Sequence, residues 1–258
     1  MLLTPEESLA ALRAEGGALA AASAGHLGAP VPACPDWSVW DLVEHTGSVH
    51  RWAAAVVEGG GRVRRRELPA GPPGDAVLDW FAEGLERLTG VLLASDPARR
   101  VWSFAVGSPS TVAWWVRRMA QETGMHRWDV EKACGGGGAV RGFDPRRAAD
   151  GIDEYLFDFL PDTSDEDLAA ATGPGGPGGP GGPRGSLHLH ATDTDTGGEW
   201  VVDLATRTAR REHAKSDTAL RGPASDLLLW LWNRQPADGH LEVLGDPGVA
   251  ERWTQVRI

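Results

Sequence analysis

The feature that most constrains the fold is a series of four amphipathic segments within the first 142 residues, each about 20 residues long. Apolar side chains recur in each segment at intervals of three and four residues, which places them on one face of a helix. Leu42, Val49 and Trp52 form such a stripe in the second segment. Helices with one apolar face bury that face against one another. The sequence therefore predicts a four-helix bundle made of residues 4–24, 38–57, 75–94 and 110–134.

Local signals support the starts and ends of these helices. Thr4 supplies an N-cap, Pro5 occupies the first helical position, and Glu7 completes a capping box. Ser38 caps the second helix, with Asp41 as a weaker capping partner. Glycine runs follow the second and fourth helices, where they end helices readily.

After Phe143 the pattern changes. A further helix is predicted from Asp144 to Leu160, followed by a GPGGPGGPGG repeat that has no side chains to bury. Beyond the repeat we expect a β-hairpin over 186–191 and 199–204, a helix over 220–234, a strand over 241–244 and a helix over 247–254. The predicted fold class is α+β, with a bundle over 1–142 and a small α+β domain over 143–258 that carries a Gly/Pro-rich loop at about 173–183.

Composition excludes several classes of function. The net charge of −11 argues against nucleic-acid binding, and the cluster of arginines at 62, 64, 65 and 66 is interpreted as a solvated loop. No apolar run approaches the ~20 residues of a membrane span, and the N-terminus lacks the pattern of a signal peptide, so a cytoplasmic location is expected. Arginine outnumbers lysine 23 to 2, which is typical of GC-rich genomes such as those of actinobacteria.

Polar residues interrupt two of the apolar helix faces. Glu122 and His126 occupy positions of the fourth helix where a core helix ordinarily carries Leu or Val, and His45 does the same on the second helix. A buried carboxylate without a partner costs several kcal/mol, so Glu122 needs one. Residues four apart share a helix face, so Glu122 and His126 can ligate one ion together with His45 from across the bundle.

Two imidazoles and one carboxylate leave a coordination position open, as catalytic metal sites do. Glu44 and Asp129 are candidates to support an imidazole by a hydrogen bond. The competing interpretation is a pair of hydrogen-bonded core histidines with an ordinary helix salt bridge. His50 is a rival to His45, five residues further on and on another face of the helix.

The segment CPDWSVWDLVEHTGSVHRW resembles the N-terminal motif of the mycothiol-dependent maleylpyruvate isomerase family, within the DinB-like superfamily of metal-binding four-helix bundles. In that family the histidine matching His45 is a metal ligand, and a Glu-x-x-x-His pair matching Glu122 and His126 supplies the other two. The segments ATDTDTGGEWVVDL and ALRGPASDLLLWLWNR are similar to the family's small C-terminal domain. The GPGGPGG insertion departs from the family pattern.

The resemblance implies an enzyme in which a divalent metal activates a low-molecular-weight thiol, mycothiol, for isomerisation or S-transfer on a small electrophile. Zinc suits the ligands best, and nickel, iron or manganese can occupy the same set. The resemblance also implies that an arginine near Arg234 holds an anionic substrate or thiol; a structural residue at a helix C-terminus is the alternative.

Two other functions remain open from the sequence: a metal hydrolase that uses bound water, and a non-enzymatic protein that binds a metal or small molecule. Cys34 and Cys134 are interpreted as structural rather than nucleophilic. His188 and His190 alternate along a strand and point to one face, but no third metal ligand is evident nearby, so an exposed sheet face is expected.

Overall fold

The computed structural model describes residues 2–65, 68–105, 108–135, 140–162, 185–195 and 197–253. The chain divides into two compact units. One comprises Leu3–Phe104 and Pro109–Gly142, and the other comprises Met1–Leu2, Ala105–Ser108 and Phe143–Ile258. No helix in the described ranges is long and apolar enough to cross a membrane. The predicted Gly/Pro-rich loop at 173–183 lies outside the described residues.

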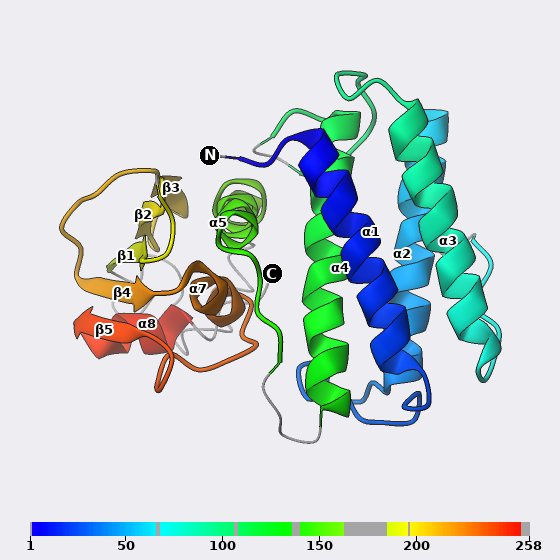
Figure 1. Cartoon of the computed structure of the whole chain (residues 1–258). Helices are drawn as coiled ribbons and strands as arrows, with labels where there is room; N and C mark the ends of the chain where they lie inside the picture. The colour runs from blue at the N-terminus through cyan, green and yellow to red at the C-terminus, as the bar shows by residue number, and fades with distance from the viewer. Residues whose placement is uncertain are drawn as a thin grey trace. The chain divides into compact units, whose positions relative to one another are not determined.

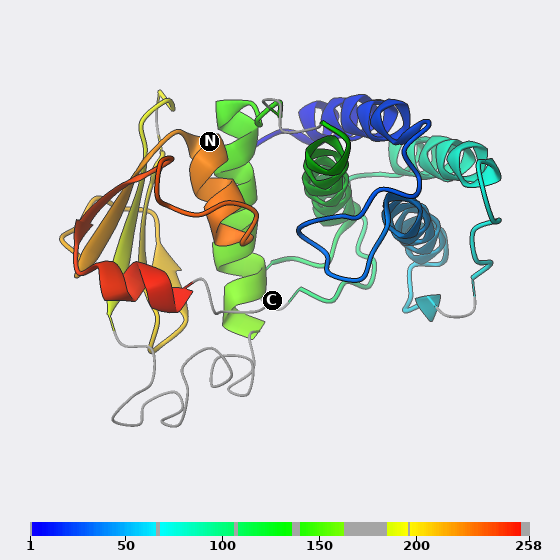
Figure 2. The same cartoon turned by 90° about the horizontal axis from the view of Figure 1, so that it is seen from below.

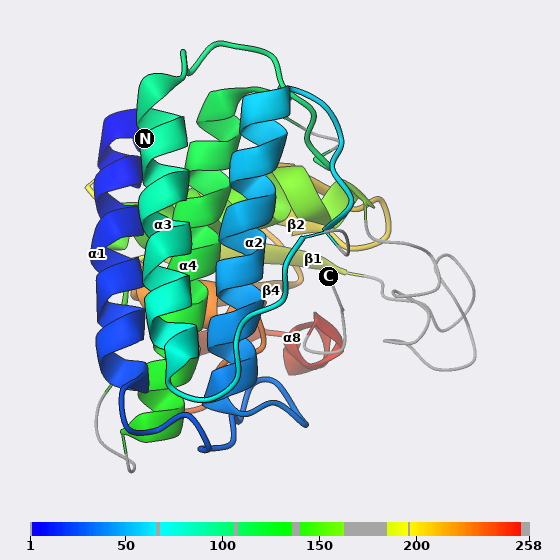
Figure 3. The same cartoon turned by 90° about the vertical axis from the view of Figure 1, so that its right-hand side faces the viewer.

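The first unit contains the helices α1 (Pro5–Ser23), α2 (Val39–Gly59), α3 (Ala76–Ala94) and α4 (Val112–Cys134). These four described helices run side by side as a bundle, seen from the side in Figure 3 and nearly along their axes in Figure 2. The predicted four-helix bundle is therefore confirmed.

The helix ends follow from the capping residues. Thr4 and Glu7 form a complete capping box at α1, and Ser38 and Asp41 form one at α2. Hydrogen bonds from the Ser38 side chain and backbone lower the pKa of Asp41, which keeps its carboxylate ionised at the positive end of the helix dipole. Gly60 caps the C-terminus of α2, and its φ of 73° lies in the left-handed region that glycine adopts without strain.

The helices α2 and α3 approach closely because small residues line their contact. A Cβ atom added to Gly47 would lie only 2.5 Å from Cζ3 of Trp80. The guanidinium of Arg51 also packs on Trp80, with its Cζ 3.8 Å from the ring centroid. Below it, buried apolar side chains from several helices form the core, among them Leu19, Val39, Leu42, Val43, Val77, Phe81 and Val130.

A buried ion pair joins α1 to α4. Arg127 is fully buried, and its Nε donates to Oε2 of Glu15 at 2.5 Å. Its Nη1 donates to Glu131 at 2.9 Å and to the backbone oxygen of Arg141. A buried charge is tolerated only when it is paired in this way, so this network fixes α1 against α4.

The second unit begins with the helix α5 (Pro145–Glu154), which continues as a π-helical turn η2 (Tyr155–Phe159) and a 3₁₀ turn η3 (Leu160–Asp162). The strands β1 (Ser186–Ala191) and β2 (Glu199–Asp203) form the predicted antiparallel hairpin. The strand β3 (Thr208–Arg210), which the sequence analysis missed, extends β2 on its outer side. Figure 1 labels α5 and the strands β1, β2 and β3.

The prediction of one helix over 220–234 is wrong. Residues Thr218–Gly222 form the strand β4, which pairs in parallel with β1, and the helix α7 covers only Ala224–Leu231. Pro223 separates the two because the residue before a proline is disfavoured in a helix. The strand β5 (Glu242–Gly245) and the helix α8 (Pro247–Trp253) follow, which gives the described sheet the order β3-β2-β1-β4-β5.

The helices α7 and α8 contact β1 and β4, and the rings of Trp230 and Trp253 stack with centroids 6.0 Å apart. Figure 2 shows α5 and α7 on the same side of the sheet. The indole N–H of Trp200 on β2 donates to Asp153 of α5 at 2.8 Å. The C-terminal unit is thus a mixed sheet with its core on the helix-covered face, as the predicted α+β class requires.

Candidate metal centre

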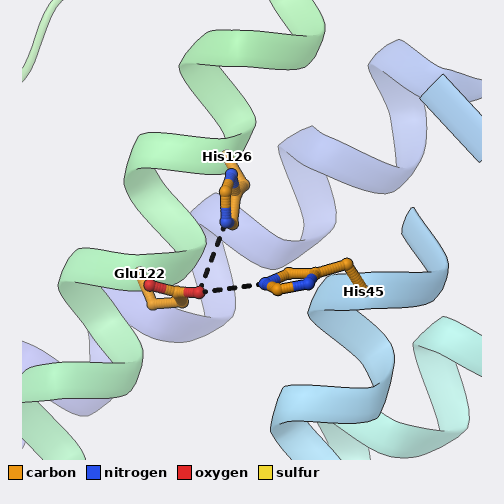
Figure 4. A group of neighbouring side chains, drawn as sticks. All are labelled: His45, Glu122 and His126. Carbon is orange, nitrogen blue, oxygen red and sulfur yellow. Dashed lines mark ion pairs between the residues drawn. The ribbon is translucent and has the colours of Figure 1, made fainter. Parts of the chain in front are cut away.

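The structure brings together the three residues that the sequence analysis singled out as metal ligands. His45 projects from α2, and Glu122 and His126 project from neighbouring turns of α4 toward it (Figure 4). Ligand atoms of all three side chains lie within 4.8 Å of one another. The side chains of His45 and Glu122 are 24% and 23% exposed and that of His126 is 10% exposed, so the cluster is accessible from solvent on one side.

One carboxylate oxygen lies between the two imidazoles. Oε1 of Glu122 is 3.5 Å from Nε2 of His45 and 3.3 Å from Nε2 of His126. Both separations exceed the usual length of a hydrogen bond. They match the separation of about 3.4 Å between two ligand atoms that each lie about 2.1 Å from a tetrahedral ion. The donor set and its spacing therefore fit a divalent metal.

The other nitrogen of His126 faces Asp129. Nδ1 of His126 donates to Oδ2 of Asp129 at 3.1 Å, and Asp129 is fully buried. A carboxylate behind a ligating imidazole fixes the ring and leaves Nε2 toward the metal. Although burial opposes protonation, Glu122 and Asp129 together raise the pKa of His126 to about 9. An incoming metal ion must therefore displace a proton from this ring.

Glu122 has a further partner that the sequence analysis missed. Arg118 is buried, and its Nη2 donates to Oε2 of Glu122 at 2.8 Å. Burial opposes ionisation, but the charges of His126 and Arg118 hold the pKa of Glu122 well below its usual value. Glu122 thus stays a carboxylate, with Oε2 held by Arg118 and Oε1 free to face the imidazoles.

Arg65 lies against His45, which the interpretation of the arginine cluster as a solvated loop did not predict. Its Nη2 donates to Nδ1 of His45 at 3.0 Å, and its Nε donates to Ser48 at 3.2 Å. The indole of Trp37 tilts over the same imidazole, with ring centroids 4.8 Å apart. Glu44, which we expected to support an imidazole, instead accepts the backbone N–H of Gly71 at 3.1 Å.

His50, the rival to His45, belongs to a different environment. It is fully buried, and its Nε2 lies 2.8 Å from Oγ1 of Thr123. Burial lowers the pKa of His50 to about 3, so the ring is neutral at physiological pH. Among the residues that the structure describes, His50 is not part of the group that could hold an ion.

The other candidate residues lie elsewhere. Cys34 and Cys134 are half-buried thiols, and burial raises the pKa of Cys134, which disfavours a thiolate there. Arg234 lies past the end of α7, after Asn233, whose φ is 55°. Its Nη1 donates to the backbone oxygen of Trp232 at 2.8 Å. Arg234 is therefore not a helix residue, and its role in binding an anion stays a prediction.

A second cluster appears where the sequence analysis found two histidines without a third ligand. Glu199 of β2 accepts a hydrogen bond from Nε2 of His188 at 2.8 Å and another from Nδ1 of His213. Together these residues form the other described group that could hold an ion. The hairpin prediction already placed Glu199 opposite the histidine strand, so this partner was available from the sequence. His213 lies in an irregular segment and carried no such signal.

Comparison with known proteins gives a consistent result for both parts of the chain. Residues 8–131 match the mycothiol maleylpyruvate isomerase N-terminal domain, and residues 146–252 match the C-terminal domain of the same family. No curated protein sequence matches the chain.

Two similar solved structures support the fold. One is the crystal structure of the mycothiol-dependent maleylpyruvate isomerase, with a TM-score of 0.57 at 12% sequence identity. The other is a histidine-to-alanine mutant of a mycothiol-dependent maleylpyruvate isomerase, with a TM-score of 0.59 at 11% identity. Each alignment covers 93% of this chain and 93% of the other. At these identities the likeness concerns the arrangement of the backbone.

Proposed function

Because the chain belongs to the mycothiol-dependent maleylpyruvate isomerase family, we propose that it is a metal-dependent enzyme that isomerises a small electrophilic substrate with mycothiol as the nucleophile. The observation that carries this proposal is the convergence of two imidazole Nε2 atoms on one oxygen of Glu122, at the spacing of metal ligands. Zinc suits this donor set best, and nickel, iron and manganese are alternatives.

The three ligands hold the ion and leave room for a thiol. A bound divalent ion lowers the pKa of a coordinating thiol, so that a thiolate is available at neutral pH. Arg118 fixes one oxygen of Glu122 and Asp129 fixes the ring of His126, so neither ligand has to reorient when the site is used. Trp37 packs against the His45 ring, with centroids 4.8 Å apart and ring planes tilted by 51°, and so helps to hold this ligand in place.

Isomerisation needs a nucleophile that adds and then leaves. Addition of a thiolate to a conjugated carbon–carbon double bond leaves a single bond that can rotate, and loss of the thiolate restores the double bond in the other geometry. The thiol is regenerated, so it acts as a cofactor rather than a consumed substrate. The family resemblance adds Arg234 as the group that orients an anionic substrate, which is part of the proposal.

The proposal is tested by metal analysis and calorimetry on the full chain. We expect each wild-type chain to retain one more metal ion than a His126→Ala chain. Wild-type protein should also bind one equivalent of mycothiol, and only when the metal is present. His45→Ala, at a more exposed position, should have the same effect, whereas His26→Ala at an exposed position of the first unit should behave as wild type. Circular dichroism confirms that each variant is folded.

Three results would contradict the proposal. Equal metal retention by His126→Ala and wild type would mean that these residues form a hydrogen-bonded core network. Ester or amide hydrolysis by the metal-loaded protein without any thiol would favour the hydrolase instead. Metal retention with no binding of mycothiol would favour an ion that only stabilises the bundle.

A further inference from the structure

The second cluster lies in the C-terminal unit and has no role in the proposed reaction. His188 belongs to β1, Glu199 begins β2, and His213 lies in the segment between β3 and β4. The strands β1 and β2 are neighbours in the sheet, with His190 paired to Glu199. Three separate segments of the chain thus direct a nitrogen or an oxygen ligand to one point.

The geometry of the cluster is that of a ligand set. Atoms of His188, Glu199 and His213 that can bind a metal lie within 4.8 Å of one another. Nε2 of His188 and Nδ1 of His213 face the same oxygen of Glu199, and the two imidazole centroids are 5.0 Å apart. We propose that His188, Glu199 and His213 bind a divalent transition-metal ion of the zinc, nickel and copper type, independently of the ion in the helical bundle.

The local charges suit a cation. Glu199 supplies a carboxylate whose Oε2 already accepts hydrogen bonds from both His188 and His213. His190 lies on the same face as His188, with ring centroids 6.0 Å apart, so the cluster is flanked by a third imidazole. Imidazole nitrogen and carboxylate oxygen together select zinc, nickel and copper over magnesium or calcium.

The unequal burial of the three side chains explains how an ion enters. His188 is 9% exposed and is fixed by the sheet, whereas His213 is 76% exposed and can rotate. In the metal-free state both rings hydrogen-bond to Glu199, so the ion replaces these protons as it binds. Water completes the coordination from the open side. The bound ion would cross-link β1, β2 and the segment before β4, and so stabilise the edge of the sheet that carries β3.

The experiment is titration of the full-length His126→Ala variant with Zn²⁺ alone by calorimetry, because this background lacks a ligand of the bundle site. We expect one equivalent of Zn²⁺ to bind and the melting temperature to rise on binding. Addition of His213→Ala, an exposed position that leaves the fold intact, should weaken the Zn²⁺ affinity by about 100-fold or more. His188→Ala should do the same, and His240→Ala, an exposed histidine of the same unit, should change nothing.

The contrary outcomes are specific to this site. Absence of Zn²⁺ binding by His126→Ala would overturn the inference and leave the proposed function untouched. Zn²⁺ binding that survives both His188→Ala and His213→Ala would place the ion elsewhere, and would also overturn it. If His45, Glu122 and His126 do not bind a metal, the His126→Ala variant should still bind one Zn²⁺, and adding His213→Ala should abolish that binding. The two proposals therefore fail separately.

Discussion

The position of one proton decides whether each imidazole of the bundle site can act as a ligand. A neutral ring binds a metal through the nitrogen that carries no hydrogen, and the hydrogen bond at the other nitrogen selects which one that is. Asp129 can only accept, so it keeps the proton on Nδ1 of His126 and leaves Nε2 for the ion. Arg65 can only donate, so it favours the opposite tautomer of His45.

The role of Asp129 gives a first prediction. Asp129→Asn keeps the size of the side chain but removes the charge that stabilises the proton on Nδ1 of His126. We expect the metal affinity to fall by about 10- to 100-fold, as for other groups that orient a ligating imidazole. Competition with a chelator of known affinity measures the change. Asp79→Asn, at an exposed position of α3, is the control, and equal affinities for the two variants would show that Asp129 has only a packing role.

Arg65 gives a prediction of opposite sign. Arg65→Ala removes the donor that holds His45 in the tautomer with its proton on Nε2, so we expect the metal to bind about tenfold more tightly, the equivalent of one charge-assisted hydrogen bond. The same chelator competition measures it. Arg64→Ala is the control, because it removes an equal charge from an exposed position of the same loop. It therefore shows how much of the change in metal affinity comes from the lost charge rather than from the His45 tautomer. A similar gain in both variants would attribute the effect to charge alone.

These partners differ in how far the sequence could predict them. His45, Glu122 and His126 stood out because polar residues interrupted apolar faces at helical spacing. Arg118 could have been found in the same way, since it precedes Glu122 by four residues and shares its face. Arg65 could not, because it reaches His45 from a loop, and loop conformations carry no periodicity.

At the scale of elements, the four long helices were predictable because periodicity, caps and terminating glycines agree with one another. The mistaken helix over 220–234 shows the limit of hydrophobic pattern alone. The apolar run Leu227–Leu231 is helical, but Gly222 and Pro223 mark the point where a strand ends and that helix begins. The strand β3 is only three residues long and is defined by pairing with β2, which local sequence does not encode.

The contact between α2 and α3 gives a prediction at this scale. Gly47→Ala puts a methyl group against Trp80, so despite the better helix propensity of alanine we expect a loss of about 1–3 kcal/mol in the free energy of unfolding. Gly90→Ala is the matched control in α3, where nothing lies within 4 Å of the added carbon. It should gain about 1 kcal/mol. Urea unfolding of the metal-free proteins measures both, and equal stabilities would show that Trp80 moves aside freely.

At the scale of the whole molecule, the change of pattern after Phe143 revealed that two kinds of structure share the chain. Helical periodicity dominates before it, and short alternating segments follow it. Ligand clusters behave differently, because they depend on which segments meet in space. The proximity of His45, Glu122 and His126 was predictable because two of these residues share a helix, whereas His188, Glu199 and His213 come from three segments and meet only when the sheet forms.

The buried histidine His50 connects a single side chain to the stability of the bundle. Its pKa is about 3 in the folded chain and about 6.5 in an unfolded one, so between these values only the unfolded chain takes up the proton. Protonation then favours unfolding, and the free energy of unfolding falls by about 1.4 kcal/mol for each pH unit below 6.5. At pH 5 this amounts to about 2 kcal/mol relative to neutral pH.

We therefore expect His50→Gln to flatten the acid side of the stability profile. Glutamine can still hydrogen-bond to Thr123 but does not titrate. Between pH 7 and pH 5, the free energy of unfolding of His50→Gln should therefore fall by about 2 kcal/mol less than that of wild type. Urea unfolding of the metal-free proteins at several pH values measures how the free energy of unfolding of each protein depends on pH. A general loss of packing at position 50 would lower this free energy equally at pH 7 and pH 5, so it would not change the slope. His26→Gln, at an exposed position, should keep the wild-type slope. Parallel profiles for His50→Gln and wild type would contradict this, because they would mean that His50 has the same pKa in the folded and the unfolded chain.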